Sequence, residues 1–472
     1  MSDLVANMSA HNNLCQDGEV MTVIHAKTAL LPDGWADDVA VTLKDGRIAG
    51  VAIGAALQGQ RVDCLLPAMV NLHSHAFQRA MAGMTEYRSA GQDSFWTWRT
   101  LMYRFLDRLS PDDVQAIAAM VMLEMSEAGY AAVAEFHYLH HAPGGHTYGD
   151  LAEMSARIAA AAAETGLGLT HLPVLYERGG CDGRALTAGQ LRFGNDPERF
   201  GKLWQAAAKV LAHLPADTVL GVAPHSLRAA SPTGIAAAAS LNPLTPIHIH
   251  VAEQVAEVAE VQAATGARPV EWLIGNTDLS ARWCLIHATQ MEPFETVAMA
   301  RSGAVAGLCP ITEANLGDGI FDGVRFRAHS GAFGVGSDSN VRISLSEELR
   351  LLEYSQRLAG KGRAMLADAD RSTGRVLYEG ACHGGALAGG RDGGAIAVGK
   401  WADLVALDCS GPDLGASQGD MILDAFLFAG DDRMVAEVWS AGRHVVTGGR
   451  HAGREAIIGR YRATMARVRA AL

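Results

Sequence analysis

Two histidines separated by one residue, His73 and His75, follow an apolar run in the segment PAMVNLHSHAF. Side chains alternate between the two faces of a strand, so both imidazoles would point the same way if the run is a strand. Two ring nitrogens that converge from one strand end could begin a metal site. An HxH pair is also common among ordinary polar residues at strand ends, so further ligands are needed downstream.

Further side chains able to bind a metal follow other apolar segments. The segment HIHVAE carries His248, His250 and Glu253, whereas His287 follows CLI and Asp338 follows GVGS. Imidazoles combined with a carboxylate suit a borderline cation such as Zn²⁺, with one coordination position left for water. A histidine at one strand end is usually structural, but several such ends in succession indicate a shared site.

The choice between His248 and His250 is open on geometry alone, because both lie on the same face of their strand. His250 is nearer the strand end and Glu253 follows three residues later, which favours His250. His248 would then lie deeper along the same strand. The predicted metal ligands are His73, His75, His250 and Asp338.

A site of this kind needs a fold that brings the ends of distant strands together. Between Leu66 and Leu387, eight strand-like apolar segments alternate with Ala-rich helical stretches. This alternation is typical of an α/β protein with a (β/α)₈ TIM-like barrel, and it favours the barrel over a doubly wound sheet. In a barrel, the C-terminal ends of all strands surround one pocket, so the polar residues that end the strands should converge there.

Short alternating segments occur at both ends of the chain, in MTVIHAKTALL and again in GAIAVGKWADLVALD. The simplest arrangement is a small β-sandwich domain built from residues 21–65 and 390–450, which encloses a metal-dependent barrel over residues 66–389. Residues 451–472 are predicted to form a C-terminal helix. Residues 1–20 are predicted to be a loose arm, because no apolar periodicity begins before residue 21.

The charge balance limits the partners of the protein. Its 51 acidic and 39 basic residues give a net charge of -12, which argues against binding to nucleic acid or to an anionic membrane surface. The seven cysteines are scattered without a CxxC pair, which is typical of a reducing compartment. The N-terminal segment has neither a basic nor an apolar signal region, and no apolar stretch approaches the length of a membrane span. We therefore predict a cytoplasmic protein.

The motifs NLHSHAF, HIHVAEQ, CLIHAT and GVGSDS together resemble the amidohydrolase superfamily in its mononuclear branch, which is typified by deaminases. Within that superfamily, the strings DSFWTWR, EFHYLHH and GSDSNVRISLSEELRLLEY resemble the formimidoylglutamate deiminase family of histidine degradation. The resemblance spans nearly the whole chain except the N-terminal arm. It implies one Zn²⁺ per subunit, a homodimer, and hydrolysis of N-formimidoyl-L-glutamate to N-formyl-L-glutamate and ammonia.

Three residues at the strand ends suit the chemistry of that reaction. Zinc lowers the pKa of a water molecule, and Asp338 can take the proton of that water. His287 can stabilise the tetrahedral adduct, and Glu253 can give a proton to the imino nitrogen and to the departing amine. No lysine ends the fourth strand segment, TVLGVAPHS, where a carbamate bridging two metals would be expected, so a single metal is predicted.

The implied substrate is a small molecule with two carboxylates, which arginine binds well because its planar group donates two parallel hydrogen bonds. Arg99, in DSFWTWR, and Arg228, in PHSLRA, are the candidate carboxylate ligands, although either could instead form a surface ion pair. Gln78, Tyr138 and His225 are predicted to donate hydrogen bonds to the substrate, because each lies at or just beyond a strand end. The segment TEANLGDGIF after the seventh strand is predicted to line the pocket.

Two other functions fit parts of the pattern. Another mononuclear zinc deaminase would use the same ligands on a guanine-like heterocycle, and its pocket would contain stacking aromatic rings and amide donors instead of arginines. A non-catalytic barrel scaffold stabilised by zinc would keep the metal ligands. Such a scaffold would not need Glu253 and His287 beside them.

Overall fold

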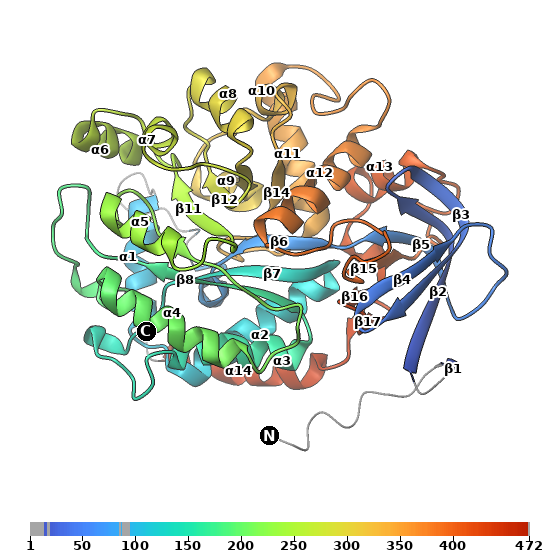
Figure 1. Cartoon of the computed structure of the whole chain (residues 1–472), viewed down its shortest axis with the longest axis horizontal. Helices are drawn as coiled ribbons and strands as arrows, with labels where there is room; N and C mark the ends of the chain where they lie inside the picture. The colour runs from blue at the N-terminus through green and yellow to red at the C-terminus, as the bar shows by residue number, and fades with distance from the viewer. Residues whose placement is uncertain (1–13, 17–18, 85, 87–94, 471–472) are drawn as a thin grey trace.

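Figure 1 shows a barrel of alternating strands and helices, joined at one end to a separate sheet domain. The computed structural model describes residues 14–16, 19–84, 86 and 95–470. The strands of the barrel are β6 (Met69–Ser74), β7 (Tyr130–His137), β8 (Gly168–Leu175), β9 (Val219–Leu220), β10 (Ala223–Pro224), β11 (Ile247–Val251), β12 (Trp283–His287), β13 (Val305–Leu308) and β14 (Phe333–Val335).

In the described part of the chain, the barrel strands run parallel and occupy eight positions, with β9 and β10 sharing one. β6, β7, β8 and β10 form one sheet, to which β9 also pairs, and β11 to β14 form a second. Parallel bridges from Ser74 to Asp338 and from Val222 to Ile247 join the two sheets at both seams. The closed ring confirms the (β/α)₈ barrel that was predicted from the alternation of segments.

The barrel strands are covered on both faces. All eight residues of β7 are buried, as are all five residues of β11 and of β12. A strand buried on both faces reads as a nearly continuous apolar run, without the alternation of a half-exposed strand. Histidines at the ends of such runs therefore lie inside the protein, where each polar atom needs a partner.

Helices surround the barrel, and several begin at a proline that follows a capping residue. Ser110 accepts a hydrogen bond from the Asp113 N–H and the Asp113 carboxylate accepts one from the Ser110 N–H, which starts α2 at Pro111. No helix among the described residues is both long enough and apolar enough to cross a membrane. The barrel helices are α1 (Phe95–Leu106), α2 (Pro111–Glu127), α3 (Glu153–Thr165), α4 (Pro197–Leu211), α5 (Pro232–Ser240), α6 (Val255–Thr265), α7 (Pro269–Asn276), α8 (Pro293–Ser302), α9 (Pro310–Leu316), α10 (Gly323–Ala328), α11 (Leu345–Gly360) and α12 (Thr373–Ala388).

The sheet domain is built from both ends of the chain, so blue and red strands lie side by side in Figure 1. β5 pairs antiparallel with β15, which places a strand that leads into the barrel beside one that follows it. Two helices, α13 (Asp420–Phe428) and α14 (Arg454–Ala470), complete the C-terminal part, and α14 packs against α2. Within the described residues the strands are β1 (Leu14–Gln16), β2 (Glu19–Leu31), β3 (Gly34–Lys44), β4 (Arg47–Ala52), β5 (Gln60–Pro67), β15 (Leu404–Leu407), β16 (Val435–Ser440), β17 (Arg443–Thr447) and β18 (Arg450–His451).

The N-terminal part differs from the predicted loose arm. β1 lies within residues 1–20 and pairs antiparallel with the start of β2, with Leu14 opposite Met21 and Gln16 opposite Glu19. β1 is too short for an apolar period to be visible in the sequence. It pairs with the first residues of β2, which come before the part of β2 that pairs with β3 and β5. The rest of the predicted arm, residues 1–13 and 17–18, lies outside the described part of the chain.

A buried ion network fastens the sheet domain to the barrel. Arg391, whose side chain is fully buried, donates hydrogen bonds to both carboxylate oxygens of Asp403 and to Asp217. Arg443 of β17 donates to both carboxylate oxygens of Asp217, which lies just before β9. Each buried charge therefore has an opposite charge and directed hydrogen bonds, and removal of one partner would leave the other uncompensated.

Candidate active site

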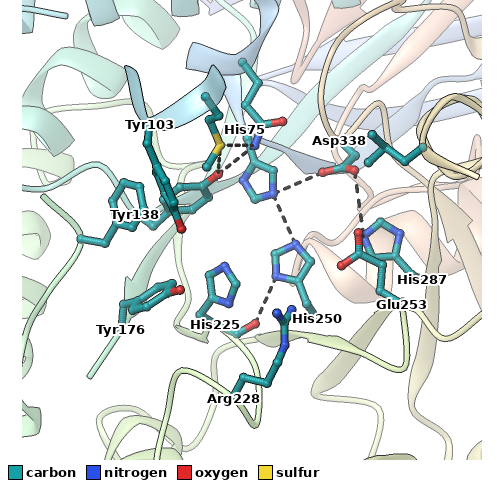
Figure 2. Close-up of a pocket in the computed structure, with 14 residues that line it drawn as sticks. His75, Tyr103, Tyr138, Tyr176, His225, Arg228, His250, Glu253, His287 and Asp338 are labelled. Carbon is teal, nitrogen blue, oxygen red and sulfur yellow. Dashed lines mark hydrogen bonds and ion pairs between the residues drawn. The ribbon is translucent and has the colours of Figure 1, made fainter. Parts of the chain in front are cut away.

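The C-terminal ends of the barrel strands surround a cavity of about 60 Å³ (Figure 2). Its lining includes three of the predicted metal ligands, His75, His250 and Asp338, and also Glu253 and His287. Strand ends that are far apart in the sequence therefore meet at one place.

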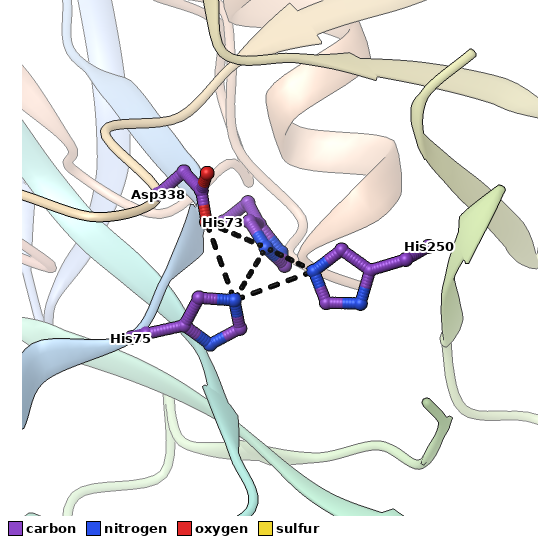
Figure 3. A group of neighbouring side chains, drawn as sticks. All are labelled: His73, His75, His250 and Asp338. Atoms are coloured by element: carbon purple, nitrogen blue, oxygen red, sulfur yellow. Dashed lines mark hydrogen bonds and ion pairs between the residues drawn. The ribbon is translucent and has the colours of Figure 1, made fainter. Parts of the chain in front are cut away.

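The four predicted ligands form one compact cluster of buried side chains (Figure 3). The His73 Nε2 atom lies 3.2 Å from His75 Nε2 and 3.1 Å from His250 Nε2, and the latter two nitrogens are 3.3 Å apart. Asp338 Oδ1 lies 3.3 Å from His73 Nε2 and 3.2 Å from His75 Nε2. The structure thus brings together one ligand atom from each of the four residues.

Hydrogen bonds among the three imidazoles cannot account for this spacing. A neutral ring nitrogen offers either one hydrogen or one lone pair in the ring plane, so three such nitrogens cannot satisfy three mutual contacts. A tetrahedron with edges like these has its centre about 2.0 Å from each corner, which is a normal metal–nitrogen or metal–oxygen bond length. The donor set and its spacing therefore fit one divalent metal ion.

Backbone carbonyls fix which ring nitrogens face the cluster. His75 donates its Nδ1 hydrogen to Phe136 O across 3.0 Å, and His250 donates its Nδ1 hydrogen to His225 O across 3.1 Å. A carbonyl only accepts hydrogen bonds, so Nδ1 carries the hydrogen and Nε2 presents its lone pair. Burial lowers the pKa of both His75 and His250, which favours the neutral form that binds metals.

His248 faces a different part of the protein. Its Nε2 donates a hydrogen bond to Ala388 O, at the end of α12, across 2.8 Å. Burial lowers the pKa of His248 to about 4, so the ring is neutral there. The structure brings His250, and not His248, into the cluster.

Left-handed backbone at three strand ends directs side chains of the site. Asp338 has φ 44°, His287 has φ 70° and Ala252 has φ 50°. Such angles cost about 1–2 kcal/mol each for residues other than glycine and are typical of functional sites. Asp338 N–H donates to His73 O and His75 N–H donates to Asp338 O, each across 2.9 Å. These backbone hydrogen bonds join the end of β6 to the segment after β14, and they hold Asp338 beside the two histidines.

Glu253, His287 and Glu313 form a chain of charged groups beside the cluster. His287 Nδ1 lies 3.2 Å from Glu313 Oε1, and His287 Nε2 lies 3.9 Å from both Glu253 Oε1 and Asp338 Oδ2. Burial alone lowers the pKa of His287, but the three carboxylates outweigh burial and raise it to about 10. Burial raises the pKa of Glu253 to about 7, although the charge of His287 opposes that increase.

Glu257 of α6 fixes the position of Glu253. One carboxylate oxygen of Glu257 accepts the Ala252 N–H across 3.1 Å, and the other accepts the Glu253 N–H across 2.9 Å. Glu257 is itself fully buried. It therefore holds the left-handed turn that delivers Glu253 to the cavity.

Four of the five predicted substrate-binding residues line the same cavity as the metal cluster. Gln78 Nε2 donates a hydrogen bond to Tyr138 Oη across 2.8 Å. Arg228 is almost completely buried and extends from below His250 in Figure 2, with His225 nearby. The fifth residue, Arg99, belongs to α1, and its side chain lies outside the part of the protein that the structure describes.

Several residues of the site were not anticipated from the sequence. Tyr176 directly follows β8 and could have been found by the strand-end rule. Tyr103 of α1 and Phe193 of a long loop carry no comparable signal. Glu313 lies in the TEANLGDGIF segment that was predicted to line the pocket, but its contact with His287 is visible only in three dimensions.

Comparison with known proteins places this geometry in context. Residues 64–445 match the family model described as "Amidohydrolase family", and residues 21–61 match "Formimidoylglutamate deiminase HutF, N-terminal domain". The chain is 51% identical over 441 residues to formimidoylglutamate deiminase of Pseudomonas aeruginosa, covering 92% of this chain and 97% of that protein. The crystal structure of an amidohydrolase from Brucella melitensis superposes with a TM-score of 0.92 at 47% identity, covering 95% of this chain and 99% of that chain. An adenosine deaminase from Xanthomonas campestris with bound zinc shares the fold, with a TM-score of 0.80 at 20% identity, over 95% of this chain and 98% of that chain.

Proposed function

The chain belongs to the amidohydrolase family, and we propose that it hydrolyses N-formimidoyl-L-glutamate to N-formyl-L-glutamate and ammonia. The similarity to the Pseudomonas aeruginosa deiminase over most of both chains supports this substrate. The observation that carries the proposal is the single cavity that combines the metal-binding cluster with Glu253 and Arg228. A metal site, a proton donor and a cation for a carboxylate are the components that this reaction requires.

We propose that His73, His75, His250 and Asp338 hold one zinc ion per subunit. Zinc bound there would act as a Lewis acid and lower the pKa of a water molecule towards neutrality. The spacing of the four ligand atoms supports a single ion. The segment after β10, HSLR, contains no lysine that could form a carbamate between two metals, which also supports one ion.

Asp338 and His287 are proposed to act on the attacking water. Asp338 directs Oδ1 to the imidazoles and Oδ2 towards His287, so one oxygen remains to take a proton. Glu313 accepts the Nδ1 hydrogen of His287, which leaves Nε2 facing the cavity. From that position Nε2 can donate a hydrogen bond to the oxygen of the tetrahedral adduct as its charge develops.

Glu253 is the proposed proton donor. A carboxyl group with a pKa of about 7 can both hold and release a proton at neutral pH. Glu253 protonates the imino nitrogen as water adds to the formimidoyl carbon. The proton that Asp338 took from that water then reaches the amine through Glu253 as the C–N bond breaks, and the hydroxyl proton of the adduct restores Glu253. The nitrogen therefore leaves as neutral ammonia.

Arg228 and Arg99 are the proposed ligands of the two substrate carboxylates. The burial of Arg228 strengthens its hydrogen bonds, because charges interact more strongly where water is excluded. Gln78, Tyr138 and His225 are proposed to donate hydrogen bonds to the substrate from the same cavity wall. An acyclic substrate with two acidic groups matches this set of donors.

We also propose that the protein is a cytoplasmic homodimer. Homodimers are common in the superfamily, which supports a dimer. The scattered cysteines and the acidic net charge support a cytoplasmic location. Light scattering coupled to size-exclusion chromatography measures the oligomeric state, and cell fractionation measures the compartment. A monomeric mass, or recovery outside the cytoplasm, would overturn the corresponding proposal without affecting the chemistry.

The test of function is ammonia release from three candidate substrates. Zinc-loaded protein is assayed with N-formimidoyl-L-glutamate, N-formimidoyl-L-aspartate and guanine, and we expect the highest kcat/KM with the glutamate derivative. Guanine is the important comparison because Tyr103, Tyr176 and Phe193 also line the cavity, and aromatic rings favour a ring substrate. A preference for guanine would overturn the substrate but not the metal chemistry. No ammonia from any substrate would favour the scaffold function.

A further inference from the structure

Two thiols from distant parts of the sequence meet where β5 and β15 pair. Cys64 lies on β5, and Cys409 follows the end of β15 by two residues. The antiparallel register places Leu407 directly opposite Cys64. Cys64 and Cys409 are close enough for each thiol to shift the pKa of the other. This pair is separate from the residues that line the active-site cavity.

The two thiols differ in their access to solvent. Cys64 is fully buried, whereas Cys409 is half-buried. Asp408, next to Cys409 in the chain, lines an open surface cavity of about 440 Å³ together with Lys27 and Asp63. The Cys409 N–H donates to Asp63 Oδ2 across 3.1 Å, which holds Cys409 beside this cavity. A small oxidant can therefore approach Cys409 more easily than Cys64.

The two thiols also differ in acidity. The neighbouring Cys64 thiol lowers the pKa of Cys409, and Lys27 contributes in the same direction, although burial and two nearby carboxylates oppose them. The Cys409 thiol, followed by burial, raises the pKa of Cys64. Because the thiolate is the reactive form, Cys409 is the thiol that meets an oxidant first. Cys64, on the paired strand, is then the resolving thiol.

We propose that Cys64 and Cys409 form a site of reversible oxidation, at which a hydroperoxide such as hydrogen peroxide converts the pair to a disulfide. The Cys409 thiolate attacks one oxygen of hydrogen peroxide, and the O–O bond breaks. Cys409 becomes a sulfenic acid, and the departing hydroxide takes the proton that the Cys409 thiol released, which gives the first water. The Cys64 sulfur then attacks the Cys409 sulfur, the S–O bond breaks, and the oxygen departs as water with the Cys64 proton. Two thiols and one hydrogen peroxide thus give one disulfide and two waters, and a dithiol reverses the change.

The disulfide would connect strands that flank the whole barrel in the sequence. The loop closed by Cys64 and Cys409 contains every barrel strand from β6 to β14, so the cross-link restricts the unfolded chain strongly. We therefore expect the oxidised protein to have a higher Tm than the reduced protein. This effect does not depend on the reaction proposed for the active site.

The test treats the metal-loaded, full-length protein with hydrogen peroxide, blocks free thiols, and maps the peptides by mass spectrometry without reduction. We expect a linked peptide pair that contains Cys64 and Cys409 and has lost the mass of two hydrogen atoms, and we expect dithiothreitol to abolish it. Cys409→Ser should prevent the link and the rise in Tm. Cys64→Ala should leave a sulfenic acid on Cys409, which a 1,3-diketone probe captures.

Cys181 provides a matched control for exposure. Cys181 is also half-buried, but burial raises its pKa to about 11. Cys181→Ser should therefore leave the formation of the Cys64–Cys409 link unchanged. The proposal is overturned if Cys409 stays reduced, if it proceeds to a sulfinic acid while Cys64 remains a thiol, or if Cys181 is oxidised as fast as Cys409.

Discussion

His287 donates its Nδ1 hydrogen to Glu313 Oε1 across 3.2 Å, and the same oxygen accepts the Cys309 N–H across 2.8 Å. Glu313 thus ties the end of β12 to the end of β13 and sets the direction of the His287 ring. A carboxylate only accepts hydrogen bonds, so Nδ1 carries a hydrogen and Nε2 faces Glu253 and Asp338. A residue that does not line the cavity therefore selects the nitrogen that faces it.

Replacing Glu313 tests this relationship. Glu313→Gln keeps the size of the side chain and one acceptor oxygen but removes the charge that orients His287. We expect kcat to fall about 10- to 100-fold, with KM and metal content nearly unchanged, as is usual for residues that orient a functional histidine. Steady-state kinetics combined with metal analysis measures both quantities. An unchanged kcat in fully loaded protein would show that His287 is oriented by other contacts.

Glu253→Gln should separate proton transfer from metal binding. The amide has nearly the same shape but cannot transfer a proton, so turnover should fall about 100-fold or more. Metal content should be retained, because Glu253 is not part of the ligand cluster. Ammonia release and metal analysis on the same preparation provide the measurement. Normal turnover would refute the role of Glu253 as proton donor.

The two histidines of β11 allow a matched test of metal binding. His250→Ala removes one of the four clustered side chains that we propose as ligands and should yield protein with little bound zinc and little activity. His248→Gln should retain its zinc, because His248 instead donates to Ala388 O. Elemental analysis after dialysis against excess zinc measures both variants. Chelation of the native protein should abolish activity and lower Tm, and added zinc should restore both. Full zinc content in His250→Ala would contradict the ligand assignment.

Arg228→Lys should weaken substrate binding more than it slows the chemical step. Lysine keeps the positive charge but cannot donate two parallel hydrogen bonds to a carboxylate. Loss of one charge-assisted hydrogen bond costs about 1.5–3 kcal/mol, so we expect KM to rise roughly 10- to 100-fold. Steady-state kinetics with N-formimidoyl-L-glutamate measures KM and kcat separately. Arg184→Lys, at a half-exposed arginine, serves as the control. An unchanged KM would exclude Arg228 as a carboxylate ligand.

His171, which lies outside the active site, should make the protein sensitive to acid. Burial lowers its pKa in the folded protein to about 3, whereas an unfolded chain has a histidine pKa of about 6.5. Between these values only the unfolded chain binds the proton, so stability is fully present above about pH 6.5 and is lost as the pH falls. The loss is at most about 1.4 kcal/mol per pH unit for one group.

Urea denaturation at about pH 7.5 and about pH 5.5 measures this sensitivity. His171→Gln should reduce the difference in free energy of unfolding between the two pH values, because glutamine does not titrate. His213→Gln, at an exposed position, should leave the difference unchanged. The prediction would be contradicted if the free energy of unfolding changed by the same amount between the two pH values in His171→Gln and in the native protein. The comparison is made on zinc-loaded protein so that the metal ligands contribute equally.

Local periodicity was enough to predict much of this protein. Alternation along a strand placed His73 and His75 on one face, and the succession of apolar runs predicted the (β/α)₈ barrel. The order of the strand ends also indicated that Glu253, His287 and Asp338 would meet. These features depend on spacing between near neighbours, which the sequence states directly.

Tertiary structure decided the features that depend on contacts between distant segments. His248 and His250 share a strand face, and only the path of α12 to Ala388 separates their roles. The contact of Glu313 with His287, and the approach of Tyr103 and Phe193 to the cavity, likewise follow from how helices and loops pack after the barrel closes. Distances across a barrel mouth are set by the packing of the whole chain, so no local pattern in the sequence contains them.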